Sequence, residues 1–163
     1  MEGLREWLAI DRNSPSGLIW INDRKYSKAK AGSAAFTSLN TAGYYRGGCL
    51  GRQYLAHRVV FFLYYGFLAD EIDHIDGNRK NNIPENLREV SRSENQHNRV
   101  ASGYCFDRRA NAYRAQIRDS GKMIYLGLYG TEEDAKSAYL NAKKKLHPTA
   151  PSRCYEELNG NHK

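Results

Sequence analysis

The stretch from Ile72 to Asn98 constrains this chain more than any other part, because it is crowded with side chains that bind metals or exchange protons. An acid and a histidine follow one another at Asp73 and His74, and a tight Asp-Gly-Asn turn begins at Asp76. Asparagines then recur to the end of the stretch, and apolar residues are few, so it adds little to a core. Such a run either shapes a loop through side-chain hydrogen bonds or builds a site for chemistry.

The composition favours a polyanion as partner. The chain has 163 residues and a formal net charge of +7, and a basic chain most often binds nucleic acid, and less often an anionic membrane. It contains no run of about 18 apolar residues that could span a membrane. Residues 1–10 lack an apolar signal region, so secretion is not expected. The cysteines stand alone at Cys49, Cys105 and Cys154, which predicts free thiols and excludes a CxxC zinc site.

The residues before this stretch predict a small set of strands and one helix. Residues 18–21 are a short apolar run typical of a strand, and residues 44–55 predict a hairpin with the glycines of 46–48 in its turn. Between His57 and Gly66 apolar residues recur at helical spacing, and the glycine is a natural stop. His57 itself is expected to have a structural role.

The central stretch predicts a compact unit of two strands and a helix. Residues 71–74 and 87–90 are expected to form the strands, with an irregular loop between them. A helix is expected from about residue 92 to residue 99. Asp73 then lies at the end of the first strand and Asn95 on the first turns of the helix. Carboxylate and amide oxygens are hard ligands that suit Mg²⁺ or Mn²⁺.

His74 adds a proton acceptor beside the expected metal ligand. A histidine has a pKa near neutrality and can take a proton from water. A metal on a phosphate and a histidine on the attacking water are sufficient for phosphodiester hydrolysis. Taken singly, each of these residues is more often structural, but together and in a basic chain they favour a nuclease.

The central stretch resembles the HNH nuclease motif in the form found in phage homing endonucleases. The resemblance rests on residues 73–78, Asn82, residues 86–88 and residues 95–98, and it extends upstream through residues 55–58. It implies that His74 is the general base, that Asp73 and Asn95 hold the metal, and that Asn86 steadies the loop through hydrogen bonds to the backbone. Arg88 and Arg99 are expected to contact phosphate.

The last ligand position departs from many members of that family, which have a histidine there. This chain offers both Asn95 and His97, and residues two apart on a helix face different directions. The spacing favours Asn95, with Asn98 on the same face one turn later, and His97 stays open as the alternative. Because no cysteine pairs flank the motif, the zinc-stapled branch of the superfamily is not expected.

The C-terminal third predicts a three-stranded antiparallel sheet backed by one helix. Strands are expected at residues 104–106, 113–118 and 123–129, the last with Ile124, Leu126 and Leu128 facing the core. Thr131 caps a helix that reaches about Leu146. Its apolar stripe is expected to contain Ala135, Ala138, Tyr139, Ala142 and Leu146.

The other face of this sheet is rich in side chains that read DNA. It is expected to carry Arg114, Gln116, Arg118 and Tyr125, with Arg108 and Arg109 in the adjacent hairpin. Arginine can read guanine and glutamine can read adenine in a major groove, and a sheet can enter that groove. A solvated face is the alternative, but so many arginines without a matching row of acids favour DNA.

Residues 103–146 resemble the AP2 DNA-binding domain. The resemblance rests on residues 113–118, Leu126-Gly127, residues 131–135 and Ala138-Tyr139, and it implies a sheet docked in the major groove. Tyr113 stands where tryptophan is common. An HNH unit followed by an AP2 unit is an arrangement found in mobile phage endonucleases.

The expected fold is therefore α+β: an HNH unit with an N-terminal hairpin and helix, plus an AP2-like domain. The expected domains are residues 1–99, with the HNH motif at about 55–99, a linker at 100–103, the AP2-like domain at 104–146 and a loose tail at 147–163.

The expected function is a metal-dependent DNA endonuclease of the HNH homing type that cuts or nicks double-stranded DNA. A monomer or weak dimer is expected, with no membrane partner, in the cytoplasm of a bacterial host if a phage encodes it. The alternative is a DNA-binding regulator whose HNH unit is only a scaffold. An RNA nuclease is less favoured, because side chains cannot read the narrow major groove of A-form RNA.

Overall fold

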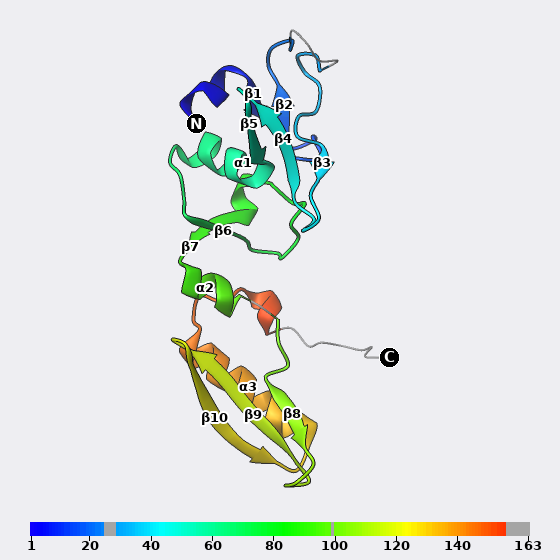
Figure 1. The fold of residues 1–163 in the computed structure, drawn as a ribbon. Coiled ribbons are helices and arrows are strands. Elements are labelled where there is room, and N and C mark those ends of the chain that lie inside the picture. Colours follow the sequence, from blue (N-terminus) through cyan, green and yellow to red (C-terminus); the bar gives the residue numbers. More distant parts are fainter. Residues whose placement is uncertain (25–28, 99, 156–163) are drawn as a thin grey trace. The chain divides into compact units, whose positions relative to one another are not determined.

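The structure is a computed structural model that describes residues 1–24, 29–98 and 100–155. The chain divides into two compact units, Met1–Ser91 and Arg92–Lys163, and each is described by itself (Figure 1). Both combine short helices with small antiparallel sheets, so the α+β prediction is confirmed. The division falls before the short helix that the sequence assigns to the first domain. No helix among the described residues is long and apolar enough to cross a membrane.

The N-terminal unit opens with two small sheets and a helix. After the 3-10 helix η1 (Glu2–Glu6), its elements are β1 (Leu8–Ile10), β2 (Leu18–Trp20), β3 (Ser38–Leu39), β4 (Tyr45–Cys49), β5 (Arg52–Leu55) and α1 (Ala56–Tyr65). Strands β1 and β2 pair antiparallel, and the second sheet has the order β3-β4-β5. Helix α1 ends as expected at Gly66, which has a positive φ of 84°.

The predicted hairpin is β4-β5, but its turn is not where the sequence placed it. Gly47 and Gly48 lie within β4, while the turn is formed by Leu50 and Gly51 with φ values of 49° and 73°. Gly47 has a different reason to be glycine, because a Cβ there would come within 2.2 Å of the Phe36 ring. A close contact between the strand and an aromatic ring therefore explains this glycine.

The hydrophobic core of this unit draws on its first twenty residues. It contains Leu4, Leu8, Leu18 and Trp20 from the N-terminal segment, Val59, Val60 and Phe61 from α1, and Leu87. Because Leu87 lies within the polar central stretch, its side chain anchors that stretch to this core. The polar stretch is therefore held by apolar residues that are mostly distant in sequence.

The two central strands lie where the sequence predicts them. They are β6 (Glu71–His74) and β7 (Leu87–Val90), paired antiparallel, with the 3-10 helix η2 (Pro84–Asn86) before the second. The register sets Asp73 opposite Arg88 and His74 opposite Leu87. The loop between the strands thus begins and ends at functional candidates.

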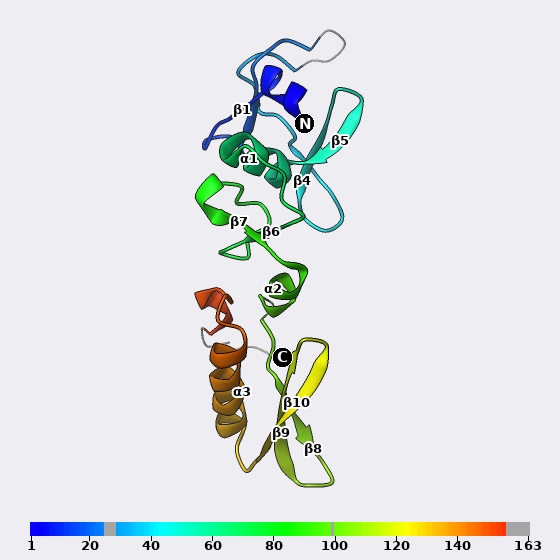
Figure 2. The same ribbon diagram turned by 90° about the vertical axis from the view of Figure 1, so that its left-hand side faces the viewer.

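The C-terminal unit contains the predicted three-stranded sheet and helix. Its elements are α2 (Arg92–His97), β8 (Tyr104–Asp107), β9 (Ala112–Asp119), β10 (Lys122–Tyr129), α3 (Glu132–Leu146) and the 3-10 helix η3 (Ser152–Cys154). The sheet has the order β10-β9-β8, and α3 packs against one of its faces (Figure 2). Thr131 caps α3 by accepting a hydrogen bond from the Asp134 backbone.

The buried face of α3 differs at its end from the predicted apolar stripe. Ala135 and Tyr139 are buried as expected. At the end of the helix, the buried residue is Lys143, whereas the predicted Leu146 is exposed. His147, one turn after Lys143, is buried as well. The stripe therefore continues along positions one turn apart that carry polar residues.

A β-bulge in β10 corrects the predicted face of one residue. Tyr125 pairs with Gln116, but the next pairs are Gly127 with Ala115 and Leu128 with Arg114. The unpaired extra residue is Leu126, and it shifts the alternation of the strand. Leu128 therefore lies on the face of Arg114 and is exposed, contrary to the prediction that it faces the core.

The segments on both sides of the sheet and helix are also part of the unit. In the expected linker, the Gly103 carbonyl accepts a hydrogen bond from the Gln116 backbone, and a Cβ on Gly103 would collide with the Tyr139 ring. After α3, Ala150 and Cys154 are buried. The prediction of a loose tail is therefore wrong up to residue 155, and its remainder lies outside the described residues.

Candidate active site

His74 is held by a buried asparagine from the loop that follows it. The residue is only 4% exposed, and its Nε2 lies 3.1 Å from Oδ1 of Asn82. The amide nitrogen of Asn82 donates to the Ser16 carbonyl at 2.9 Å. Because that carbonyl can only accept, the amide oxygen must face His74, and Nε2 must be the ring nitrogen that donates. Nδ1 is then the nitrogen able to take a proton.

The surroundings of His74 keep it neutral. Burial lowers its pKa, while the hydrogen bond with Asn82 and the charges of Asp76 and Asp73 act in the opposite direction. The ring of His57 lies 5.2 Å away, and burial, with the neighbouring positive charges, lowers the pKa of that histidine to about 3. A neutral imidazole is the form that a general base requires.

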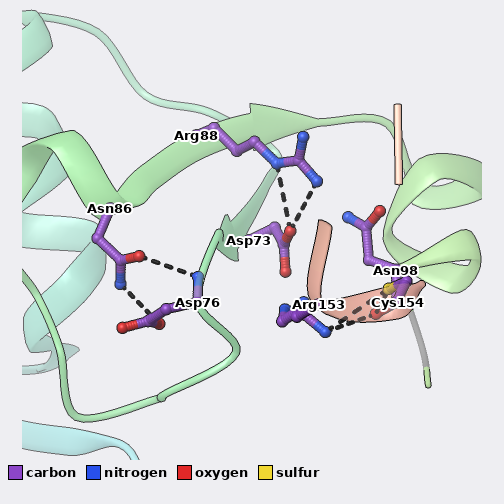
Figure 3. Close-up of polar contacts among 7 residues, drawn as sticks. All are labelled: Asp73, Asp76, Asn86, Arg88, Asn98, Arg153 and Cys154. Atoms are coloured by element: carbon purple, nitrogen blue, oxygen red, sulfur yellow. Dashed lines mark hydrogen bonds and ion pairs between the residues drawn. The ribbon is translucent and has the colours of Figure 1, made fainter. Parts of the chain in front are cut away.

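Asp73 is paired with Arg88 across the two strands. Its side chain is 9% exposed, and its Oδ2 lies 3.1 Å from Nη2 and 3.3 Å from Nε of Arg88 (Figure 3). The antiparallel register produces this contact by placing the two residues opposite each other. Arg88, predicted as a phosphate contact, thus orients the carboxylate of the predicted metal ligand.

Asn86 fastens the two ends of the loop between β6 and β7. Its side-chain oxygen accepts from the Asp76 backbone at 3.0 Å, and its amide donates to Asp76 Oδ1 at 2.9 Å (Figure 3). The amide also donates to the Asn81 carbonyl at 2.8 Å. Burial would raise the pKa of Asp76, but hydrogen bonds from Asn81, Asn78 and Asn86 lower it overall. The loop that carries Asn82 is thereby fixed.

The remaining predicted residues of the motif lie in the C-terminal unit or outside the described residues. Asn95 is half-buried on α2 and belongs to a different unit from Asp73. The backbone carbonyl of Asn98 accepts from Nη1 of Arg153 at 2.8 Å and from Sγ of Cys154 at 3.2 Å (Figure 3). Arg99 lies outside the described residues.

His97, the alternative last ligand, faces other partners within its own unit. Its Nε2 lies 3.8 Å from Oδ1 of Asp119, and its ring stacks on that of His147. These partners come from the end of β9 and from the residue after α3. His97 therefore belongs to a second cluster of metal-binding side chains, composed of His97, Asp119 and His147.

The outer face of the C-terminal sheet carries the predicted DNA-contacting side chains. Arg114, Gln116 and Arg118 alternate along β9 with the buried residues Ala115 and Ile117. The remaining predicted residues are Tyr125, 60% exposed opposite Gln116, and Arg108 and Arg109, exposed in the β8–β9 turn.

Two features of this face were missed from the sequence. Asp107 forms an ion pair with Arg114, so the face does include an acid. Met123 lies opposite Arg118, and Leu128 lies opposite Arg114, both about half exposed. The face is therefore part basic and part apolar, a combination that suits phosphates and the apolar parts of bases.

Asn82 is the candidate functional residue whose role the sequence did not reveal. It was one match among several asparagines of the motif, and nothing distinguished it from its neighbours. Its hydrogen bond to Ser16 joins residues 66 positions apart. A contact of that length leaves no local signal in the sequence.

A comparison with family models supports the assignment of the central stretch. Residues 54–97 match the model described as HNH endonuclease, a span that begins in β5 and ends at the last residue of α2. This match includes His74 and Asn82 and supports an HNH nuclease that acts on DNA. No curated protein and no solved structure matches the chain.

Proposed function

We propose that this protein is a metal-dependent endonuclease of the HNH homing type that hydrolyses a phosphodiester bond in double-stranded DNA. The observation that carries the proposal is the geometry of His74, a neutral, buried histidine whose tautomer Asn82 fixes beside the Asp73 carboxylate. It lies within the span that matches the HNH endonuclease model. A hydrolase for phosphodiesters requires a base of this kind.

In this proposal each residue of the centre has a separate task. Nδ1 of His74 takes the proton from the water that attacks phosphorus, and the nearby charges of Asp73 and Asp76 favour the resulting imidazolium. Asn82 holds the ring, Arg88 orients Asp73, and Asn86 keeps the loop in place.

The proposed metal ligands have the chemistry that a hard divalent ion prefers. Asp73 offers a carboxylate oxygen, and the resemblance adds the amide oxygen of Asn95, which fits Mg²⁺ or Mn²⁺ with water completing the shell. When bound, such an ion stabilises the negative charge that develops on the phosphate.

The C-terminal sheet is proposed to bind the DNA as an AP2-like domain, by its outer face. Its arginines and Gln116 contact phosphates and base edges, and exposed Tyr125 adds an aromatic surface. Double-stranded DNA is the proposed partner, because a major groove of B-form width admits a sheet.

Cleavage of supercoiled plasmid DNA tests the proposal. With Mg²⁺ or Mn²⁺ the protein is expected to convert supercoiled circles to nicked or linear DNA, and EDTA is expected to stop the reaction. DNA binding without cleavage under any divalent ion would favour a non-catalytic binding protein. Cleavage that persists in EDTA would contradict the role of a metal.

Replacing Asn82 tests the orientation of the base. We expect Asn82→Ala to lower kcat by about 10-fold to 100-fold with little change in KM, because a misoriented base loses part of its usual contribution of about 10² to 10⁴. Steady-state cleavage kinetics measure the effect. Asn141→Ala, a change at an exposed asparagine of α3, is the matched control. An unchanged kcat in Asn82→Ala, with a normal circular dichroism spectrum, would contradict the assigned role.

Replacing Arg118 tests the DNA-binding face. We expect Arg118→Ala to weaken DNA binding by about 1–3 kcal/mol, roughly 5-fold to 150-fold in Kd, because an exposed arginine of this face is lost. The control is Lys145→Ala, which removes the same charge from an exposed position at the end of α3. Equal losses of affinity in the two variants, measured by fluorescence anisotropy, would show that net charge alone drives binding.

A further inference from the structure

Three segments of the C-terminal unit bring metal-binding side chains together. His97 is the last residue of α2, Asp119 is the last residue of β9, and His147 follows the end of α3. Oδ1 of Asp119 lies 3.8 Å from Nε2 of His97 and 3.6 Å from Nε2 of His147. One ligand atom from each residue lies within 4.8 Å of the others. These separations are too long for hydrogen bonds.

His147 has no other use for its polar atoms within the described residues. Its side chain is 5% exposed, yet neither ring nitrogen has a hydrogen-bond partner there. The backbone of Arg118 lies close enough to His147 to act against the lowering of its pKa. It does not meet the geometry of a hydrogen bond to either ring nitrogen. Because an unsatisfied buried polar group carries a penalty, such a group calls for a missing partner.

Asp119 and His97 each have a further contact that orients them within the cluster. Oδ2 of Asp119 accepts from the Ser120 hydroxyl at 3.3 Å, which leaves Oδ1 as the oxygen on the histidine side. The His97 and His147 rings stack with centroids 3.6 Å apart. Nε2 of His97 also lies 3.5 Å from the Ser93 hydroxyl. Burial and the neighbouring His97 lower the pKa of His147, while the charge of Asp119 acts in the opposite direction.

We propose that His97, Asp119 and His147 bind one divalent transition-metal ion, with Zn²⁺ as the best match. Two imidazoles and a carboxylate are a donor set of zinc sites, whereas Mg²⁺ prefers oxygen ligands throughout. Zinc bonds of about 2.0–2.2 Å place tetrahedral ligand atoms about 3.3 Å apart. The observed separations of 3.6 and 3.8 Å need to close by only a few tenths of an ångström.

Binding also requires the two rings to leave their stack. One ion cannot lie in the planes of two parallel rings, so His97 and His147 must tilt as the ion enters. Both line a cavity of about 710 Å³ within the same unit, together with polar side chains that include Arg118 and Ser93. The cavity provides space for this movement and for a water molecule as the fourth ligand.

The proposed ion joins helix α2 to the sheet and to the segment after α3. Helix α2 buries none of its side chains. Asn98, the residue directly after it, is buried. An ion held by α2, the β9–β10 turn and the residue after α3 fastens all three together. Its role is therefore structural, and it differs in ligand chemistry from the oxygen-rich nuclease centre.

Titration of the metal-free protein tests the proposal. Zn²⁺ is added in a calorimeter in the presence of excess Mg²⁺, which occupies oxygen-only sites. We expect one equivalent of Zn²⁺ to bind. Loss of a residue that only supports a ligand typically weakens metal binding by about 10-fold to 100-fold. Asp119→Asn and His97→Gln each remove a ligand, so we expect them to weaken binding by more than that. Co²⁺ in place of Zn²⁺ is expected to give the visible absorption of a tetrahedral site in the wild type, but not in Asp119→Asn or His97→Gln.

Two further variants separate this site from its alternatives. Glu133→Gln, an exposed carboxylate on α3, and Asp73→Asn, in the nuclease centre, are expected to bind Zn²⁺ like the wild type. Loss of the equivalent in Asp73→Asn would place the ion at the nuclease centre and overturn the proposal. No binding by the wild type, or unchanged binding by Asp119→Asn, would also overturn it. Circular dichroism confirms that each variant is folded.

Discussion

His74→Ala is expected to lower the rate of DNA cleavage by about 10² to 10⁴-fold at saturating Mg²⁺, the usual contribution of a general base. The variant removes the only group in the proposed mechanism that takes the proton from the attacking water. It leaves Asp73 and its partner Arg88 in place. Because the residues proposed to bind DNA lie in the other unit, the Kd for DNA is expected to stay at the wild-type value.

Single-turnover cleavage and a separate binding titration measure this result. Added imidazole is expected to restore part of the rate, because it can occupy the space of the missing ring and accept the proton. Wild-type cleavage by His74→Ala would end the assignment of this residue as the base. A parallel loss of DNA affinity would point instead to damage of the fold, which circular dichroism detects.

Leu18→Ala is expected to destabilise the N-terminal unit by about 2–5 kcal/mol, the usual cost of a large cavity in a core. Leu18 is 0% exposed and lies in the cluster that also buries Leu87, the residue opposite His74 in the register. Because a domain is stable by only about 5–15 kcal/mol, this loss removes a large part of its stability.

Tryptophan fluorescence reports this unfolding selectively, since both tryptophans of the chain, Trp7 and Trp20, belong to the N-terminal unit. Urea unfolding of Leu18→Ala is expected to begin at a clearly lower concentration than in the wild type. Leu68→Ala, which truncates a leucine that is 55% exposed, is the control and is expected to stay close to the wild type. Similar midpoints for Leu18→Ala and the wild type would contradict the core described for this unit.

The parts of the fold that the sequence predicted are those that depend on neighbouring residues. Strands β6 and β7, the cap at Thr131 and the stop at Gly66 follow from alternation, side-chain capping and the positive φ of glycine. The turn of the β4–β5 hairpin was misplaced because Gly47 is required by close contact with Phe36, a residue of another segment, and not by a turn. The core role of Leu4 and Leu8 likewise depends on contacts with α1 that no local pattern reveals.

The candidate site divides in the same way. Asp73 and His74 are adjacent in sequence, so their proximity was certain, and the register of two short strands then brought Arg88 to Asp73. The tie between Asn82 and Ser16 and the meeting of His97 with Asp119 and His147 depend on how distant segments pack. Single histidines and aspartates are common, so these partners could not be recognised from the sequence.

If the C-terminal sheet binds DNA as proposed, the bulge at Leu126 decides which positions of β10 a mutant library must vary to test DNA preference. Before the bulge the outer face of β10 is formed by Met123 and Tyr125, and after it by Leu128, because one extra residue reverses the parity of the strand. A library built on simple alternation would mutate Gly127, whose side of the strand faces the helix and whose φ of 134° disfavours other residues. A library at 123, 125 and 128 would sample the whole face of that strand.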